Sequence, residues 1–394
     1  MSLRLSFLVS GLLLTCLLCS CKSEPAKKVK TTVGFKSRPV LVPEQKVSTL
    51  AIGMKAPDFN LPGVNGTYHS LSDYDHKDIL VVVFTCNHCP TAQAYEERLK
   101  DLTTDYKGKG VQVLAISPNS PLGLLYEELG YSDLGDTYED MVVRAEDASF
   151  NFPYLYDGDN QRVSLAYGPV ATPHCFVFDK ERTLRYVGRI DGSEKPGTAN
   201  AEDLRSALDQ LIAGTEVTTP TTKTFGCSTK WGWKTAMREK IDSEWDQKEV
   251  TLSEVDLNEV KGLMDNGGEK LRLINLWATW CAPCRLEYPD FVIIQRMFGA
   301  RDFEFISLSA DKLEKKERAL EFLKSKSSAL DNYISKEDDK YALIEAVDPN
   351  WNGALPYTAL VEPGGNIVWS HQGSVDFQEL KKIIVEHPMI GRVY

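Results

Sequence analysis

The feature that most constrains the fold of this chain is a pattern that occurs twice: an apolar run, a Cys-x-x-Cys pair and a helix-compatible stretch. The two copies read ILVVVFTCNHC at residues 79–89 and LRLINLWATWCAPC at residues 271–284. Apolar, β-branched runs of this length predict strands that are buried on both faces, and the spacing of apolar residues after each pair predicts an amphipathic helix. Each cysteine pair therefore lies where a strand passes into a helix.

The elements that follow each cysteine pair repeat in the same order. Each copy continues with a strand, an X-Pro step (Thr172-Pro173 and Leu355-Pro356), two strands joined by a turn, and a closing helix. We expect these strands at 111–117, 174–179 and 184–188 in the first copy, and at 303–309, 355–362 and 367–371 in the second. We expect the closing helices at 200–212 and 376–385. The chain is predicted to hold two copies of one α/β fold, each a central mixed sheet flanked by helices.

The N-terminal segment has the composition of an export signal. Arg4 precedes an apolar run over 5–18 that is too short for an ordinary membrane-spanning helix. The next residues, Leu18-Cys19-Ser20-Cys21, resemble the bacterial lipobox, which implies lipid on Cys21 and a place in the bacterial cell envelope, facing the periplasm. A plain cleaved signal is the alternative. The predicted organisation is a lipoprotein signal peptide (1–21), a flexible tether (22–48), a first domain (49–233), a connecting helix (234–248) and a second domain (249–394).

Composition and motif content exclude several classes of function. A formal net charge of −11 argues against nucleic acid as a partner, because binding phosphate needs a clustered basic face. No stretch after residue 21 is apolar for long enough to span a bilayer. The sequence contains no phosphate loop, no nicotinamide or flavin fingerprint and no nucleophile elbow, so we expect no organic cofactor.

The segment WATWCAPC, which ends the second copy, points to thiol-disulfide exchange. Backbone N–H groups and the helix dipole lower the pKa of a thiol at a helix start, so Cys281 is the expected nucleophile and Cys284 the resolving thiol. Pro283 limits the freedom of the loop, and Trp280 directly precedes the pair. A zinc site is the structural alternative, but it needs four ligands, and the second domain offers no further Cys or His couple.

The second domain resembles the membrane-tethered TlpA/ResA-like thioredoxins through its WATWCAPC segment, Arg285, Glu287, Pro289 and Leu355-Pro356. The resemblance covers roughly 249–394 and implies a cis peptide bond at Pro356 that faces the disulfide and leaves backbone groups free to dock a substrate strand. Asn275 stands where cytosolic-type thioredoxins carry a buried Asp, so proton removal from Cys284 is left to water or Glu287. Leu355 replaces the Thr that is usual in the tethered relatives.

The first domain resembles the redoxin branch of the thioredoxin-like fold, which includes the peroxiredoxins, through Ala56-Pro57-Asp58-Phe59 and the residues at 63–71. A thiol peroxidase is therefore one alternative, but Val83 and Ile79 stand where peroxiredoxins place a Thr and a Pro. The segment CNHCP at 86–90 instead resembles a redoxin-type thioredoxin group, and FGCSTKW at 225–231 resembles that group's C-terminal signature. The resemblance makes Cys86 and Cys89 the catalytic thiols and assigns Cys227 to the first domain.

His88 lies between the two cysteines of the first pair, with Thr172 and Pro173 as the corresponding supporting residues. A protonated imidazole there stabilises a thiolate and makes the disulfide more oxidising, so electrons are expected to pass from the second pair to the first. A solvent-facing loop residue is the alternative for His88. A metal-binding module is another alternative for this domain, in which a soft ion such as copper is held by Cys86, His88, Cys89, His174 and Cys175.

The remaining cysteines, Cys175 and Cys227, have three open interpretations: a structural bridge, free buried thiols, or extra redox partners of the first pair. Arg98, Asp136 and the acidic run at 337–339 are expected on solvated faces, and Trp231, Trp233, Trp245 and Trp351 are expected in packing. The sequence thus predicts an exported, membrane-anchored thiol-disulfide oxidoreductase. Its expected partners are exported thiol or disulfide proteins and a membrane reductant or oxidant.

Overall fold

The computed structural model describes residues 35–391 of the chain. The predicted signal peptide, the predicted lipidation residue Cys21 and the first part of the predicted tether lie outside these residues. No helix in the described part of the chain is both long enough and apolar enough to cross a membrane.

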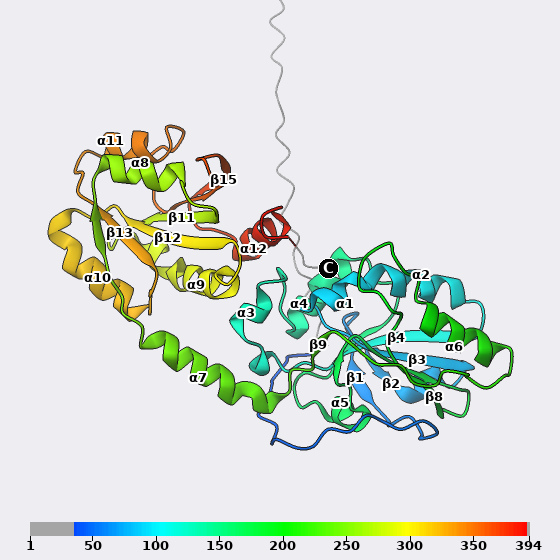
Figure 1. The fold of residues 1–394 in the computed structure, drawn as a ribbon. Coiled ribbons are helices and arrows are strands. Elements are labelled where there is room, and N and C mark those ends of the chain that lie inside the picture. Colours follow the sequence, from blue (N-terminus) through cyan, green and yellow to red (C-terminus); the bar gives the residue numbers. More distant parts are fainter. Residues whose placement is uncertain (1–34, 392–394) are drawn as a thin grey trace, which may run out of the picture. The chain divides into compact units, whose positions relative to one another are not determined.

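The first domain is built on a five-stranded sheet with the strand order β5-β4-β3-β7-β8, of which β3, β4 and β8 are labelled in Figure 1. β3, β4 and β5 run parallel, and β7 and β8 complete the sheet in antiparallel fashion. The strands are β3 (Ile79–Phe84), β4 (Val111–Ser117), β5 (Tyr154–Tyr156), β7 (His174–Phe178) and β8 (Leu184–Gly188). Two further pairs of short strands are β1 (Asn60–Pro62) with β2 (Tyr68–Ser70) and β6 (Ala171–Thr172) with β9 (Cys227–Ser228).

The helices of the first domain cover both faces of its sheet. They are α1 (Pro90–Ala94), α2 (Glu96–Tyr106), α3 (Tyr126–Leu129), α4 (Tyr138–Asp147), α5 (Arg162–Tyr167) and α6 (Glu202–Ile212). Val81 and Val83 of β3 face a core formed with α2, α4 and α6, while Val82 and Phe84 face a second core formed with α5. The apolar run therefore predicted a strand buried on both faces correctly, and the end of β3 delivers Cys86.

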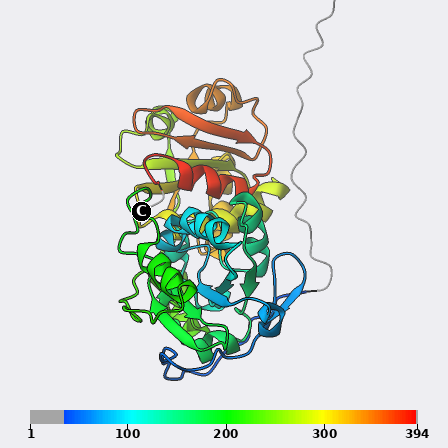
Figure 2. The ribbon, with the colours of Figure 1, turned by 90° about the vertical axis from the view of Figure 1, so that its right-hand side faces the viewer.

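The second domain contains a six-stranded sheet with the order β10-β13-β12-β11-β14-β15. Its strands are β10 (Ser253–Val255), β11 (Leu271–Trp277), β12 (Phe303–Ser309), β13 (Asp331–Ser335), β14 (Tyr357–Val361) and β15 (Ile367–Gln372). α8 (Leu257–Asp265) and α11 (Lys340–Val347) cover one face. α9 (Ala282–Phe298), α10 (Lys316–Ser325) and α12 (Phe377–Glu386) cover the other; α12, in red, crosses the front of this domain in Figure 2.

The helix α7 (Thr235–Asp246) lies between β9 and β10, where a connecting helix was expected. The tryptophans expected in packing do pack: Trp231 stacks on Trp233, and Trp351 stacks on Tyr357. The predicted α/β class, with two sheet-containing domains and helices on both faces of each sheet, is confirmed.

Candidate functional site

The second cysteine pair lies at the start of α9. Cys281 and Cys284 form a disulfide with a Sγ–Sγ distance of 2.00 Å. Cys281 directly precedes the first helical residue, and its sulfur accepts a hydrogen bond from the backbone N–H of Cys284 over 3.3 Å. Both cysteines are buried, whereas the neighbouring Trp280 side chain is 69% exposed. This is the position in which a helix N-terminus stabilises a thiolate on the first cysteine.

A groove of about 260 Å³ lies beside the second pair, and Trp280, Trp351 and Leu355 are among its lining residues. Leu355 packs against the cluster that contains both cysteines, and the peptide bond to Pro356 is cis, as the resemblance implied. The residues before Pro356 belong to no strand in the described part of the chain. Among them, the carbonyl oxygen of Ala354 accepts a hydrogen bond from Nε1 of Trp351 over 2.7 Å.

Two acidic residues lie near the second pair: Glu287 follows it in the sequence, and Asp311 contacts the loop before it. Glu287 follows Cys284 by one turn of α9, and its Oε2 accepts a hydrogen bond from the N–H of Val375 over 3.2 Å. Burial raises the pKa of Glu287 to about 7. Asp311 holds the loop before the cysteines, because it accepts hydrogen bonds from the N–H and the hydroxyl of Thr279 over 2.7 and 2.8 Å.

At the first cysteine pair the second cysteine, and not the first, stands at the helix start. α1 begins at Pro90, so Cys89 is the residue before it, and the Cys89 sulfur accepts a hydrogen bond from the N–H of Ala92 over 3.4 Å. Cys86 lies on the loop between β3 and α1 and is buried, as is Cys89. The activating position at the helix N-terminus therefore belongs to Cys89.

Thr172 connects both sulfurs of the first pair to the strand that precedes Pro173. Its hydroxyl lies 3.1 Å from the Cys86 sulfur, its carbonyl oxygen lies 3.3 Å from the Cys89 sulfur, and its peptide bond to Pro173 is cis. Burial, with Cys89 and Asp136 nearby, raises the pKa of the Cys86 thiol well above its usual value. Burial acts in the same direction on Cys89, but hydrogen bonds with Cys227 and Cys86 and the charge of His88 outweigh it, so its pKa lies well below the usual value.

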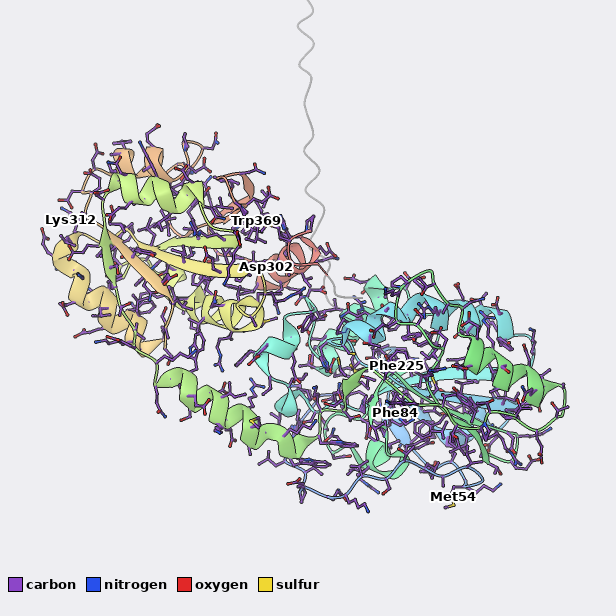
Figure 3. All side chains as sticks on the ribbon, viewed as in Figure 1. Met54, Phe84, Phe225, Asp302, Lys312 and Trp369 are labelled. Atoms are coloured by element: carbon purple, nitrogen blue, oxygen red, sulfur yellow. A yellow bond between two sulfur atoms is a disulfide. The ribbon has the colours of Figure 1, made fainter. Side chains whose placement is uncertain are left out.

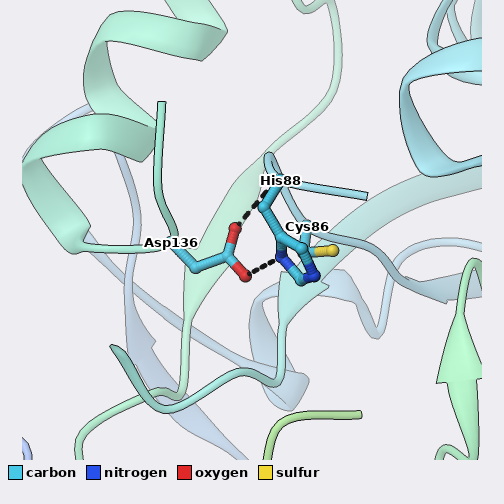
Figure 4. Close-up of side chains that lie close together, drawn as sticks. All are labelled: Cys86, His88 and Asp136. Atoms are coloured by element: carbon cyan, nitrogen blue, oxygen red, sulfur yellow. Dashed lines mark hydrogen bonds and ion pairs between the residues drawn. The ribbon is translucent and has the colours of Figure 1, made fainter. Parts of the chain in front are cut away.

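His88 is buried and paired with Asp136, as Figure 4 shows beside the sulfur of Cys86. His88 Nδ1 lies 2.6 Å from Asp136 Oδ2. Burial alone lowers the pKa of His88, but the carboxylate of Asp136 outweighs it, so the pKa is raised. In turn, burial raises the pKa of Asp136, but His88 and the hydrogen bonds to the carboxylate outweigh it and lower that pKa. The interpretation of His88 as a solvent-facing loop residue is wrong.

The expectation that Asp136 lies on a solvated face is also wrong. Asp136 is fully buried, and besides His88 it accepts hydrogen bonds from the N–H groups of Asn87 and His88 and from the amide of Asn119. It therefore fixes the loop between the two cysteines. The same expectation is wrong for Arg98, which is buried and forms an ion pair with Asp191 over 2.9 Å. A charged side chain is buried when a partner from a distant segment compensates it, which a local pattern does not show.

Cys227 lies with the first pair, whereas Cys175 does not. Cys227 is partly exposed and packs against the buried cluster of Cys86, Cys89 and Ala92. Cys175 lies on β7, opposite Val83 of the neighbouring strand β3, and its side chain is in the core, where burial raises its pKa far above the usual value. A bridge between Cys175 and Cys227 is therefore not supported.

The five-residue metal site considered from the sequence does not assemble. His174 and Cys175 are consecutive residues of β7 and face opposite sides of the sheet, as neighbours on a strand must. His174 packs on Phe176, away from Cys175, and burial lowers its pKa to about 4. Within residues 35–391, the group of possible ligands that does come together is Cys86, His88 and Asp136, whose ligand atoms lie within 4.8 Å of one another.

Comparison with known proteins gives the family. The model of the AhpC/TSA family matches residues 52–187 and again residues 238–370, which together are more than half of the chain. The chain belongs to the AhpC/TSA family. Each match contains one cysteine pair, so the family pattern occurs twice, as the repeated elements predicted.

Relatives of this AhpC/TSA chain include thiol-disulfide oxidoreductases. The thiol-disulfide oxidoreductase ResA of Geobacillus thermodenitrificans is 26% identical over 166 residues, which is 42% of this chain and 80% of that protein. A putative peroxiredoxin of Mycobacterium tuberculosis is 26% identical over 150 residues, or 38% of this chain and 84% of the relative. Among solved structures, a hypothetical protein of Sinorhizobium meliloti 1021 is 32% identical with a TM-score of 0.42, covering 48% of this chain and 98% of its own.

The family, the fold and the disulfide at the helix start agree on the class of chemistry. The two domains are thioredoxin-like, and the prediction that this AhpC/TSA chain is an oxidoreductase of the thiol-disulfide class is confirmed. The roles of individual residues within that class remain predictions.

Proposed function

We propose that the chain exchanges disulfides with other exported proteins while anchored to a membrane through lipid on Cys21. In this proposal the second domain is the TlpA/ResA-like unit, and Cys281 is its nucleophile and Cys284 its resolving thiol. The first domain is a redoxin-type unit whose thiols, Cys86 and Cys89, form a further redox pair. A membrane reductant or oxidant supplies or removes the electrons.

One observation carries the proposal: the Cys281–Cys284 disulfide at the start of α9, next to a cis peptide bond and an open groove. Exposed Trp280 gives that groove an apolar rim on which a partner chain can pack. After reduction, the Cys281 thiolate attacks a partner disulfide and forms a mixed disulfide. Cys284 then attacks the Cys281 sulfur, which releases the partner as a dithiol and restores the internal disulfide.

Glu287 supports this second step. A carboxyl group whose pKa lies at about 7 accepts a proton near neutral pH, and Glu287 lies one helical turn from Cys284. Asn275, which replaces the buried acid of cytosolic-type thioredoxins, donates a hydrogen bond to the hydroxyl of Thr358 over 3.0 Å. Since an amide side chain accepts no proton at this pH, we assign to Glu287 the role of accepting the proton of Cys284.

The test uses the full chain with Cys86 and Cys89 replaced by Ser, so that only the second pair acts. Adding Cys281→Ser is expected to abolish reduction of insulin disulfides, while adding Cys284→Ser instead traps mixed disulfides that are visible on a non-reducing gel. Adding Cys175→Ser, at a buried thiol outside both pairs, is the matched control and is expected to leave turnover unchanged. Undiminished turnover in the Cys281→Ser chain would contradict the assignment.

Anchoring has its own test. Cells that express the wild-type chain are expected to incorporate labelled palmitate into it, and cells that express Cys21→Ala are not. A Cys21→Ala chain that is processed and labelled like the wild type would refute the lipid anchor.

A metal site remains the second candidate for the first domain, on the basis of Cys86, His88 and Asp136. The hydrogen bond of 2.6 Å between His88 and Asp136 already joins two of the three ligands directly, which favours thiol chemistry over metal binding. Copper(I) and zinc titrations of the reduced chain distinguish the two: stoichiometric binding lost in Cys86→Ser supports the metal module. Turnover of hydrogen peroxide that depends on Cys86 or Cys89 would support a thiol peroxidase, the other alternative.

A further inference from the structure

The docking edge of the first cysteine pair is occupied by the chain itself. β9 pairs antiparallel with β6, so Cys227 lies opposite Thr172 and Ser228 lies opposite Ala171. These are the residues before the cis bond to Pro173, and they correspond to the residues before Pro356, which pair with no strand in the described part of the second domain. Gly226 permits the close approach: its φ is +129°, and a Cβ at this position would collide with the carbonyl oxygen of Thr172.

The segment around β9 is held in place from both ends. Phe225, labelled with Phe84 inside the first domain in Figure 3, packs against the core and against the ring of Tyr95. After β9, the hydroxyl of Thr229 donates to the carbonyl oxygen of Pro169 over 2.9 Å. The N–H of Lys230 donates to Asn119 over 2.8 Å, and the amide of Asn119 also binds Asp136. The segment therefore belongs to the same buried network that fixes the first pair.

This placement puts a third thiol against the first pair. Cys227 packs on the cluster of Cys86 and Cys89, and Cys227 and Cys89 shift each other's pKa. Cys86 and Cys89 are 2% and 0% exposed, while Cys227 is partly exposed, so the thiol that solvent and partners reach is Cys227. Cys227 occupies the position, relative to the cis proline, that the resemblance assigns to a docked substrate.

We propose that Cys86, Cys89 and Cys227 form a three-thiol relay in which Cys89 is bonded alternately to Cys86 and to Cys227, and that dithiol proteins react with this domain at the Cys227 sulfur. The relay rests on the proposed function, because it assumes that the first pair is redox-active. It assigns the central role to Cys89, the residue at the helix start, instead of Cys86.

The relay requires no reactant besides the partner dithiol. Starting from a Cys86–Cys89 disulfide, the Cys227 thiolate attacks the Cys89 sulfur; the Cys89–Cys227 bond forms, the Cys86–Cys89 bond breaks, and Cys86 leaves as a thiolate that takes up a proton. A thiolate of the partner then attacks the Cys227 sulfur, and Cys89 leaves as a thiolate. The partner's second thiol attacks its own mixed-disulfide sulfur and releases Cys227. The partner loses two electrons, and the Cys86–Cys89 disulfide gains them.

The pKa shifts of Cys227 and Cys89 favour this direction, whereas burial raises the pKa of Cys86 and makes it the slower leaving group. Hydrogen bonding to the Cys89 sulfur is the largest cause that raises the pKa of Cys227, and this cause disappears when Cys89 is part of a disulfide. Cys227 therefore becomes easier to ionise in the oxidised domain, in which it must attack. When a partner attacks Cys227, the hydrogen bond from Cys86 and the charge of His88 still lower the pKa of the departing Cys89 sulfur, while the contribution of Cys227 is lost.

The test maps disulfides in the full chain. Wild type, Cys86→Ser, Cys89→Ser and the control Cys175→Ser are equilibrated with oxidised glutathione, quenched with N-ethylmaleimide, and analysed by proteolysis and mass spectrometry. The relay predicts a Cys89–Cys227 bond in most Cys86→Ser molecules, a detectable fraction of the same bond in wild type and Cys175→Ser, and none in Cys89→Ser. If Cys86→Ser instead yields free or glutathionylated Cys89 beside free Cys227, the relay is overturned.

The same samples separate this failure from a failure of the proposed function, because the Cys86–Cys89 peptide of the wild type reports whether the first pair oxidises and the Cys281–Cys284 peptide reports the same for the second. A second measurement follows reduction of the oxidised first pair by a reduced thioredoxin. Cys227→Ser is expected to slow this reduction by at least about tenfold, because only buried sulfurs then remain. An unchanged rate in Cys227→Ser would overturn the relay even if the Cys89–Cys227 bond forms.

Discussion

The two cysteine pairs follow similar strands on the same fold, yet a different cysteine stands at the helix start in each. Pro90 comes after Cys89, whereas Pro283 comes between Cys281 and Cys284. Proline is favoured in the first turn of a helix, so α1 begins after the second cysteine and α9 begins after the first. The position of one proline thus decides which sulfur lies at the activating helix N-terminus.

The two pairs also differ in what holds and what covers them. A buried aspartate fixes the loop at each cysteine pair. Asp311 binds Thr279, which precedes the second pair, and Asp136 binds His88, which lies between the two cysteines of the first pair. A groove lined by Trp280 and Leu355 lies beside the second pair, while β9 pairs with the residues before Pro173 at the first. All four cysteines are buried, so the two domains differ in what borders the pair: a groove lined by Trp280 in one domain and the strand β9 in the other.

The largest expected effect breaks the buried network of the first pair. Asp136→Ala removes the partner of a buried imidazole and the acceptor for the Asn87 and Asn119 hydrogen bonds, so it is expected to lower the free energy of unfolding by about 3–5 kcal/mol. Urea denaturation measures the change. The control Asp338→Ala, at an exposed carboxylate, is expected to change stability by less than about 0.5 kcal/mol. Equal losses in the two variants would remove the proposed difference between the loops.

The next effect concerns Glu287 and pH. Turnover at the second pair is expected to rise through pH 7, where Glu287 loses its proton. Glu287→Gln is expected to lower turnover at pH 8 by about 100-fold and to flatten the pH profile of turnover. Glu321→Gln, at an exposed position on α10, is the matched control; a profile that is the same in both variants contradicts the role of Glu287.

Glu287 also makes stability depend on pH. Because folding raises its pKa, the folded protein binds the proton more tightly, so this group lowers the free energy of unfolding as the pH rises from 4.5 to about 7.

A smaller effect separates the reduction potentials. If protonated His88 stabilises the Cys89 thiolate by about 1.4 kcal/mol, the first pair lies roughly 30 mV above the second, and His88→Ala lowers its potential. Asp136 offsets part of this effect, because its negative charge raises the pKa of Cys86. Titration in glutathione buffers, read out by peptide mapping of both pairs, measures the difference. A first pair that is the more reducing of the two would contradict the predicted direction of electron flow.

The smallest predicted effect is at the rim of the groove. Trp280→Ala is expected to weaken reduction of a protein disulfide by about fivefold, the equivalent of about 1 kcal/mol of lost contact, because an exposed ring packs on a partner only at its edge. Reduction of a small disulfide reagent is expected to stay unchanged. A loss that is equally large with the small reagent would place Trp280 in the chemistry instead of in partner binding.

The sequence predicted the elements that have strong local signals, and the site only in part. The repeated strand–cysteine–helix pattern predicted β3 and β11. The two X-Pro steps predicted β7 and β14, which pair antiparallel with β3 and β11. Short elements such as β5 and β10 were not expected, because three-residue strands carry no usable periodicity. Asp136 was missed because its partner His88 lies 48 residues away in the sequence. Pro90 indicates a helix that begins directly after Cys89, because proline is favoured at the first helical position, but the prediction for the first pair did not include this indication.

The claim that the two pairs differ in access is tested most directly by reduction of insulin disulfides in two full-length variants. Cys86→Ser/Cys89→Ser retains the second pair alone, and Cys281→Ser/Cys284→Ser retains the first pair with Cys227. With dithiothreitol as reductant, the chain with the second pair is predicted to reduce insulin at the wild-type rate. The chain with the first pair is predicted to be at least about tenfold slower, because β9 covers Cys86 and Cys89 and the pKa of the accessible Cys227 thiol is raised in the reduced domain. Equal rates in the two variants would contradict the account.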